Sequence, residues 1–237
     1  MTDVRQTFER EGWLFVPGLL TPATVKALLA SAQKLEAQSR DLTHDTLVRG
    51  VGFEVQSASG RKGEPAVEPG ALRKITFPSK SQGSFERVRR DPRVLELLKT
   101  CGLHDAKCHV DQLNFKRANV GTSFPFHQDA RFVVGTTQGK IERYGGLNLV
   151  IALDPADAGN GGFEVLGRTH QSGLIDFPYD LATTNEGVFD ETHRTLVALA
   201  PGDAVLFHPL LAHGSGPNKS DRPRRLVTMW FVGSPLT

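Results

Sequence analysis

The sequence predicts an α+β protein with helices in its first part and an antiparallel β-sandwich or jelly roll in its second. Helical patterns are confined to about the first 105 residues of the 237-residue chain. From residue 106 onward, short β-rich runs alternate with clusters of Gly, Pro, Asn and Asp. Short strands without long helices between them are typical of antiparallel double-sheet folds. Because one domain can be this long, we expect 1–237 to be a single domain, with a mainly helical part at 1–105 and a β core at 106–237.

Three helices are predicted in the N-terminal part. The first covers Asp3 to Glu11 and ends at Gly12. The second begins at Thr21-Pro22, an N-cap followed by a first-turn proline. Its apolar residues follow helical spacing and are Val25, Leu28, Leu29, Ala32 and Leu35. The third helix begins at Asp91-Pro92.

The segment 56–70 predicts a long loop. It is rich in Gly, Pro, Ser and charged residues and has no hydrophobic periodicity. It is longer than the usual connection between elements, which is typical of either a disordered segment or a functional lid. We retain both interpretations of 56–70.

Seven strands are predicted in the second part, because turn residues separate short runs of β-forming side chains. The runs are His109 to Phe115, Phe124 to Val134, Leu147 to Leu153, Gly162 to Leu166, Thr195 to Leu199, Ala204 to Leu211 and Leu226 to Val232. Turn clusters stand at 158–162, 201–203 and 214–218.

Composition excludes several classes of protein. The net charge of +2 predicts no binding to nucleic acid or to an anionic membrane surface. No apolar run approaches the roughly 18 residues of a membrane helix. Cys101 and Cys108 are the only cysteines, too few for a disulfide framework or a Cys-rich zinc site. The start of the chain has no long apolar run typical of a signal peptide, so we expect a cytoplasmic protein.

A His-x-Asp sequence at His127 and Asp129 is the first candidate for chemistry. On a strand, residues two apart point to the same face, so this imidazole and carboxylate can bind one metal ion. The mixed N/O donor set suits Fe(II), especially where a second, distant histidine completes it. His213 ends a predicted strand, and a new strand begins near Arg224. Across such a hairpin both side chains can line one pocket, where a guanidinium would bind a small carboxylate.

Other residues compete for these roles. A second His-x-Asp, at His109 and Asp111, has no turn and arginine to support it, and we interpret it as structural. His208 lies inside an apolar run, which favours a hydrogen-bonded core histidine. Since adjacent strand residues face opposite sides, only one of Arg224 and Arg225 can enter the pocket.

The order of these segments resembles the phytanoyl-CoA dioxygenase family of Fe(II)/2-oxoglutarate oxygenases, which includes ectoine hydroxylase. The distal half of the family's motif is similar to His213-Gly-Ser-Gly-Pro-Asn-Lys-Ser with Arg224 eleven positions after His213. Its metal motif is similar to Phe126-His127-Gln128-Asp129. Its Asn-Gly…Pro-Gly-Ser-His element resembles 160–170, although Arg168-Thr169 replaces the usual Pro-Gly-Ser. Its N-terminal signature is similar to 8–12 with 16–20, so the resemblance spans nearly the whole chain.

The resemblance implies a double-stranded β-helix core (jelly roll, cupin-like) with the N-terminal helices packed on one sheet. It implies His127, Asp129 and His213 as Fe(II) ligands. The residues it implies for 2-oxoglutarate are Arg224, Ser215, Asn114, Phe124 and Gln128. The presence of Asp129 argues against the halogenase branch of such enzymes, where this carboxylate is missing.

The expected function is an Fe(II)- and 2-oxoglutarate-dependent dioxygenase that uses O2 to hydroxylate an unactivated C–H bond and releases succinate and CO2. Arg131 follows Asp129 at the same two-residue step, so we expect it to face the pocket and contact an anionic substrate group. Further candidates for the substrate pocket are Lys74, Gln112 and Arg143. The expected partner is a small polar or anionic metabolite, and the oligomeric state is open between monomer and homodimer. The alternatives are a non-catalytic jelly-roll binding protein and a cupin-type metal enzyme that does not use 2-oxoglutarate.

Overall fold

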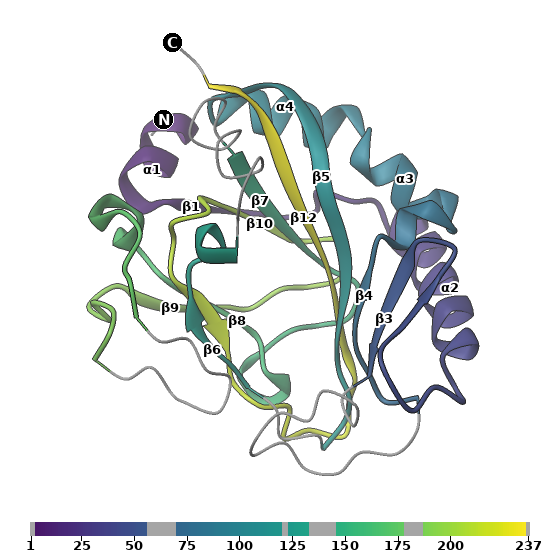
Figure 1. Cartoon of the computed structure of the whole chain (residues 1–237). Helices are drawn as coiled ribbons and strands as arrows, with labels where there is room; N and C mark the ends of the chain where they lie inside the picture. The colour runs from purple at the N-terminus through teal and green to yellow at the C-terminus, as the bar shows by residue number, and fades with distance from the viewer. Residues whose placement is uncertain (1–2, 56–69, 120–122, 133–145, 178–186, 236–237) are drawn as a thin grey trace.

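Two antiparallel sheets form the core of the protein (Figure 1). The computed structural model describes residues 3–55, 70–119, 123–132, 146–177 and 187–235. The large sheet has eight strands in the order β1-β10-β7-β12-β5-β4-β3-β2, and the small sheet has four in the order β6-β11-β8-β9. Apolar side chains of β7, β10 and β12 pack in one cluster with those of β8 and β9, so the sheets face each other. The predicted α+β class is therefore confirmed.

Helices and strands have the following bounds. The α-helices are α1 Val4–Glu11, α2 Pro22–Gln38, α3 Gly83–Arg89 and α4 Pro92–Thr100, and the 3-10 helices are η1 Pro78–Lys80, η2 Asp129–Phe132, η3 Ala158–Asn160 and η4 Thr169–Ser172. The strands of the large sheet are β1 Trp13–Val16, β2 Thr46–Val48, β3 Val51–Val55, β4 Leu72–Thr76, β5 Leu103–Lys116, β7 Gly146–Ala152, β10 Ala204–Phe207 and β12 Arg224–Pro235. Those of the small sheet are β6 Phe124–His127, β8 Phe163–Leu166, β9 Arg194–Val197 and β11 His213–Ser215.

The two-residue alternation of the central strands gives the large sheet one dry face and one face with polar residues. On β7, Leu147, Leu149 and Ile151 join the cluster that includes the helices. Asn148 and Val150, at the intervening positions, face the small sheet and line a cavity there. Since every residue of β7 is buried, its sequence reads as a continuous apolar run apart from this one asparagine.

The N-terminal helices cover the dry face of the large sheet, as predicted (Figure 1). Helix α2 begins where expected, with the Thr21 hydroxyl accepting a hydrogen bond from the Thr24 backbone N–H. Its Leu28 and Leu35 are fully buried in the cluster of the dry face. The predicted α4 is capped by Asp91, whose carboxylate accepts from the Arg93 backbone N–H.

Several boundaries differ from the prediction. Strands β1 to β4, β11 and helix α3 were not predicted. The strand predicted for 124–134 ends at His127, and Asp129 begins a 3-10 turn. The strand predicted for 204–211 ends at Phe207, where the His208 N–H turns to the Gly12 carbonyl.

Two further expectations from the sequence concern the loop at 56–70 and the lack of a membrane helix. Residues 56–69 of the predicted loop lie outside the described residues, so both interpretations of that segment stay predictions. Among the described helices, none has the length and apolar character needed to cross a membrane.

Candidate active site

A cavity of about 570 Å³ lies between the two sheets. The large sheet contributes inward residues of β4, β5, β7, β10 and β12, and the small sheet contributes residues of β6, β8 and β11. It contains the polar side chains that the alternation of the strands turns away from the helices. The cavity is partly lined by the apolar cluster between the sheets, and its other walls carry most of the polar side chains that face inward.

Three predicted ligand side chains meet in this cavity. His213 of β11 is the direct cross-strand partner of His127 of β6, and their ring centroids lie 4.4 Å apart. The Asp129 Oδ1 atom lies 3.4 Å from His127 Nε2 and 3.6 Å from His213 Nε2. One donor atom from each residue lies within 4.8 Å of the other two, a spacing that allows all three to bind one ion.

Backbone carbonyls fix the tautomer of both histidines. Nδ1 of His127 lies 2.8 Å from the Pro125 carbonyl, and Nδ1 of His213 lies 3.0 Å from the Leu211 carbonyl. A carbonyl only accepts hydrogen bonds, so each Nδ1 carries a proton, and Nε2, the ring nitrogen on the side of Asp129, is the atom of each histidine that would bind a metal ion. Burial lowers the pKa of His213 to about 4, which keeps this imidazole neutral near pH 7.

Asn148 orients the carboxylate between these histidines. Its Nδ2 donates a 2.7 Å hydrogen bond to Asp129 Oδ2, which leaves Oδ1 directed at the histidines. Burial disfavours the charged form of Asp129, but His213 and His127 together hold its pKa below the ordinary value. Sequence reasoning missed Asn148, although a lone amide in the apolar run of β7 is the signal that could have identified it.

The donor set and its surroundings fit Fe(II) and a dicarboxylate. Two imidazoles and one carboxylate on one side of a cavity are the donor set of a 2-His-1-carboxylate iron site. Arg224 lines the same cavity and is 2% exposed, and none of the described residues forms a hydrogen bond with its buried Nε atom. Burial lowers the pKa of Arg224 to about 9, while the charge of Asp154 opposes this shift. A buried guanidinium with an unused donor fits a carboxylate oxygen.

The neighbouring arginine is on the other face of β12. The Arg225 guanidinium pairs with Asp154 at 2.8 Å and with Glu36 at 3.3 Å. Its donors are thereby used inside the protein, on the side of α2. The alternation of the strand therefore selects Arg224 for the cavity, as the sequence predicted for one of the two.

Five further predicted residues line the cavity, which are Ser215, Asn114, Phe124, Lys74 and Gln112. The Asn114 amide donates to the Thr228 hydroxyl at 2.8 Å. The Phe124 ring lies 4.5 Å from the Arg73 guanidinium carbon. Another candidate, Arg143, lies outside the described residues.

Two predicted residues, Gln128 and Arg131, lie elsewhere. The Gln128 amide donates to the carbonyls of Gly173 and Leu210 and accepts from the Ile175 N–H. The Arg131 guanidinium donates to the Phe177 carbonyl and lies 4.4 Å from the ring of the same residue.

The 3-10 turn that begins at Asp129 explains why Gln128 and Arg131 do not line the cavity. Because the strand ends at His127, the two-residue alternation on which the Arg131 prediction rests does not continue through the 3-10 turn. Gln128 and Arg131 instead hold the segment 173–177 against this turn.

The expected hairpin between His213 and Arg224 is also wrong. His213 lies on β11 of the small sheet, and Arg224 begins β12 of the large sheet. They reach one cavity because the sheets face each other, and their strands are not paired.

The rival pair His109 and Asp111 is split by a β-bulge. Trp230 of β12 pairs with Val110, and the next residue, Phe231, pairs with Cys108, so His109 is an extra residue in β5. A bulge re-aims the side chain of its extra residue. His109 thus lines the cavity, whereas Asp111 faces the helices.

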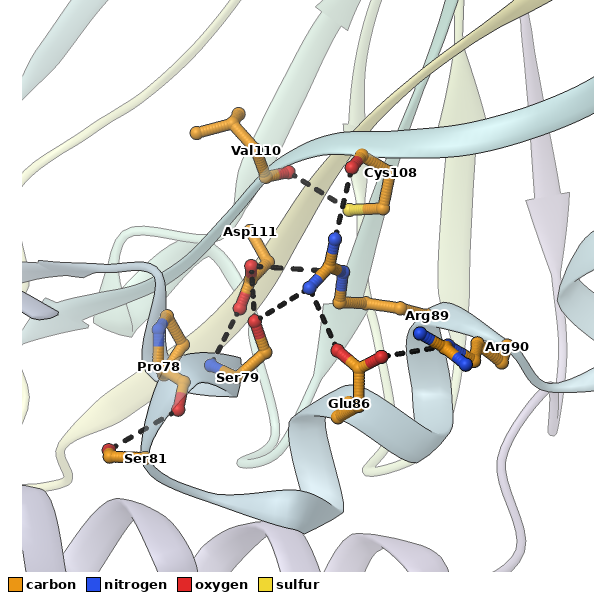
Figure 2. A network of polar contacts seen from close by, with 9 residues as sticks. All are labelled: Pro78, Ser79, Ser81, Glu86, Arg89, Arg90, Cys108, Val110 and Asp111. Carbon is orange, nitrogen blue, oxygen red and sulfur yellow. Dashed lines mark hydrogen bonds and ion pairs between the residues drawn. The ribbon is translucent and has the colours of Figure 1, made fainter. Parts of the chain in front are cut away.

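Asp111 has a structural role on the helix side (Figure 2). Its carboxylate accepts from the backbone N–H and the hydroxyl of Ser79, at 3.0 and 2.8 Å. Arg89 of α3 donates to the same hydroxyl, to Glu86 and to the Cys108 carbonyl. This network fastens η1 and α3 to β5.

Comparisons with known proteins agree with this geometry. The sequence model of the phytanoyl-CoA dioxygenase family matches residues 8–226. "Phytanoyl-CoA dioxygenase domain-containing protein 1" of Danio rerio is 24% identical over 267 residues, which cover 98% of this chain and 90% of the relative. The L-proline trans-4-hydroxylase of Streptomyces griseoviridis is 23% identical over 98% of this chain and 86% of its own.

A solved structure supports the architecture. EctD from S. alaskensis, solved with 2-oxoglutarate and 5-hydroxyectoine, has a TM-score of 0.74 at 20% identity over 98% of this chain and 76% of its own. At this identity the likeness concerns the fold. It confirms the predicted jelly-roll core with helices on one sheet.

Proposed function

The chain belongs to the phytanoyl-CoA dioxygenase family, whose members are Fe(II)- and 2-oxoglutarate-dependent dioxygenases, and from this premise we propose that it hydroxylates a C–H bond of a small polar or anionic metabolite. The observation that carries the proposal is the meeting of three metal-binding side chains and one unpartnered buried guanidinium in a single cavity. A protein that only binds a ligand has no need of both features.

Each group has a proposed role. His127, Asp129 and His213 hold Fe(II), which when bound supplies the activation of O2 that is coupled to decarboxylation of 2-oxoglutarate to succinate and CO2. Arg224 binds the distal carboxylate of 2-oxoglutarate, and Ser215, Asn114 and Phe124 line the space beside it. Asn148 keeps the Asp129 carboxylate in place, which is how an outer hydrogen bond tunes a metal ligand.

Charge in the cavity supports an anionic substrate. Arg73 and Lys74 both line the cavity and share one carboxylate, that of Glu54, at 2.6 and 3.1 Å. One positive charge of this trio is therefore uncompensated by Glu54. The relative named as an L-proline hydroxylase is consistent with a small charged substrate.

Substrate-stimulated succinate formation tests the proposal. Fe(II)-loaded enzyme is supplied with 2-oxoglutarate, O2 and each member of a panel of amino acids and other small organic acids. We expect one class of compounds to raise succinate release above the substrate-free rate and to yield a product heavier by one oxygen atom. Absence of both succinate and the visible absorption band of an anaerobic Fe(II)·2-oxoglutarate complex would favour a binding protein. Turnover that does not consume 2-oxoglutarate would favour a cupin-type metal enzyme.

A further inference from the structure

Trp230 places an unused hydrogen-bond donor beside the metal-binding residues. The residue is 9% exposed and lines the cavity, and its buried Nε1 atom has no hydrogen-bond partner within the part of the chain that the structure describes. Buried N–H groups are nearly always paired, so an unpaired one in a cavity indicates a ligand atom that completes it. An indole N–H only donates, and its partner must therefore be an acceptor.

The strand register locates this donor. Trp230 pairs across β12 with Asn148 of β7 on one side and with Val110 of β5 on the other. All three line the cavity, and Asn148 is the residue bonded to Asp129. The indole is therefore one strand away from the residue that orients the carboxylate ligand.

The β-bulge adds a second side chain at the same place. It turns His109 into the cavity, where its ring lies edge-on to the Trp230 ring with centroids 6.5 Å apart. Without the extra residue in β5, alternation would direct His109 away from the cavity along with Asp111. Strand β5 thus has its bulge directly beside the position where it pairs with Trp230.

2-Oxoglutarate does not explain this donor. Arg224 stands six residues before Trp230 on the same strand, about 20 Å along β12. In the proposed function, one carboxylate of 2-oxoglutarate is at Arg224 and the other is at the metal-binding face. No cosubstrate carboxylate remains for the indole, so the donor is available to the second molecule in the cavity.

We propose that Trp230 and His109 form the subsite for a carboxylate group of the substrate, an inference that rests on the proposed function. The charges of Fe(II) and dianionic 2-oxoglutarate cancel each other when both are bound. Among the described residues, Arg73, Lys74 and Arg224 then outweigh Asp129 and Glu54 by one positive charge. This charge lies toward the Arg224 end of the cavity, because Lys74 pairs with Asn114 and Asn114 pairs with Leu226. It favours an anionic substrate, and the carboxylate of such a substrate supplies the acceptor that Trp230 lacks.

Calorimetric titration of the anaerobic Fe(II)·2-oxoglutarate enzyme tests the subsite. The ligands are amino acids and other short carboxylic acids, each paired with its primary amide. Trp230→Phe keeps an aromatic ring and removes only the N–H donor, and Trp13→Phe is the matched control because these are the two tryptophans of the chain. We expect a carboxylate to bind the wild type more tightly than its amide, with its Kd about tenfold higher in Trp230→Phe and unchanged in Trp13→Phe. His109→Ala should weaken the same ligand.

The outcomes separate this inference from the proposed function. The visible band of the Fe(II)·2-oxoglutarate complex reports cosubstrate binding directly, and we expect it at the same 2-oxoglutarate concentration in wild type and Trp230→Phe. If the band forms but no carboxylate binds, or if Trp230→Phe binds it within twofold of wild type, the subsite is overturned. If the band is absent from the wild type, the proposed function itself fails.

Discussion

At the scale of the residue, two adjacent arginines on β12 have opposite environments. Arg224 is on the face toward the cavity, and Arg225 is on the face toward α2. Arg225 is neutralised by Asp154 and Glu36, and Arg224 has no ion pair among the described residues. Burying a guanidinium without its partner is unfavourable, so Arg224 is maintained for a ligand that brings its own negative charge.

Replacing Arg224 tests this assignment. Arg224→Gln should raise the KM for 2-oxoglutarate at least about 30-fold, since loss of one partner from a buried charge pair costs roughly 2 kcal/mol or more. Steady-state succinate formation at varied 2-oxoglutarate measures the effect. Arg225→Gln is the control, which should lower thermal stability and leave this KM unchanged. An unaltered KM in Arg224→Gln would remove Arg224 from the cosubstrate site.

Asn148 offers a second test at this scale. Asn148→Ala should weaken Fe(II) binding about 10- to 100-fold, because it removes the hydrogen bond that holds Asp129. Competition with a chromophoric chelator measures the affinity. Asn114→Ala, which loses only the bond to Thr228, should retain it. Equal affinities in the two variants would show that the Asp129 carboxylate needs no such support.

At the scale of the element, the sequence predicted those features that depend on local pattern. The starts of α2 and α4 follow from Thr21-Pro22 and Asp91-Pro92, and the central strands follow from apolar runs between turn residues. Features set by distant contacts were missed. The 3-10 turn after His127 depends on Gln128 bonding to Gly173 and Leu210, and the bulge at His109 depends on the register of β12.

The same contrast applies to the site. The three ligands and Arg224 have distinctive neighbours in sequence, so motifs identified them. Asn148 and Trp230 are part of apolar strands, and only the facing of the two sheets shows that they line the cavity. The alternation along β7 and β12 shows that Asn148 and Trp230 share a face with their neighbours two residues away. It does not show what that face packs against.

A glycine on β12 tests the pairing of the two longest strands. A Cβ at Gly233 would lie 2.2 Å from the His104 carbonyl oxygen, at a register shift between β12 and β5. Because this neighbour is backbone, Gly233→Ala should lower the free energy of unfolding by about 1–3 kcal/mol. Gly52→Ala, where the Cβ would meet Thr76 at an ordinary 3.6 Å, should be close to neutral. Urea unfolding of both variants decides, and equal stability would mean that the register shift relaxes freely.

At the scale of the whole molecule, two joints connect the β core to the N-terminal elements. One is the network of Asp111, Ser79 and Arg89 that fastens η1 and α3 (Figure 2). The other lies where α1 meets β1, and it contains His170 and His208, whose ring centroids are 5.5 Å apart. The His170 Nε2 donates to the Glu9 carbonyl, so this joint ties the N-terminal helix to the core through histidine.

This second joint makes the stability of the protein sensitive to acid. Burial, with a smaller contribution from the charge of His170, lowers the pKa of His208 from 6.5 to about 4. The unfolded chain therefore binds a proton at His208 between these pH values and the folded chain does not. The contribution of His208 to the free energy of unfolding is greatest above pH 6.5. It falls by about 3 kcal/mol as the pH drops from 6.5 to 4.

Substituting His208 should flatten that dependence. His208→Asn keeps an acceptor for the Leu210 N–H, which now donates to His208 Nδ1 at 3.1 Å, and removes the titrating group. Wild type and His208→Asn are both unfolded with urea at pH 7 and at pH 4, without metal. The buried His213, whose pKa is about 4, is present in both proteins and contributes equally to each. Wild type should lose more stability than His208→Asn over this interval. If the two lose the same amount, the histidine is protonated without disturbing the joint, and the acid sensitivity of the fold has another origin.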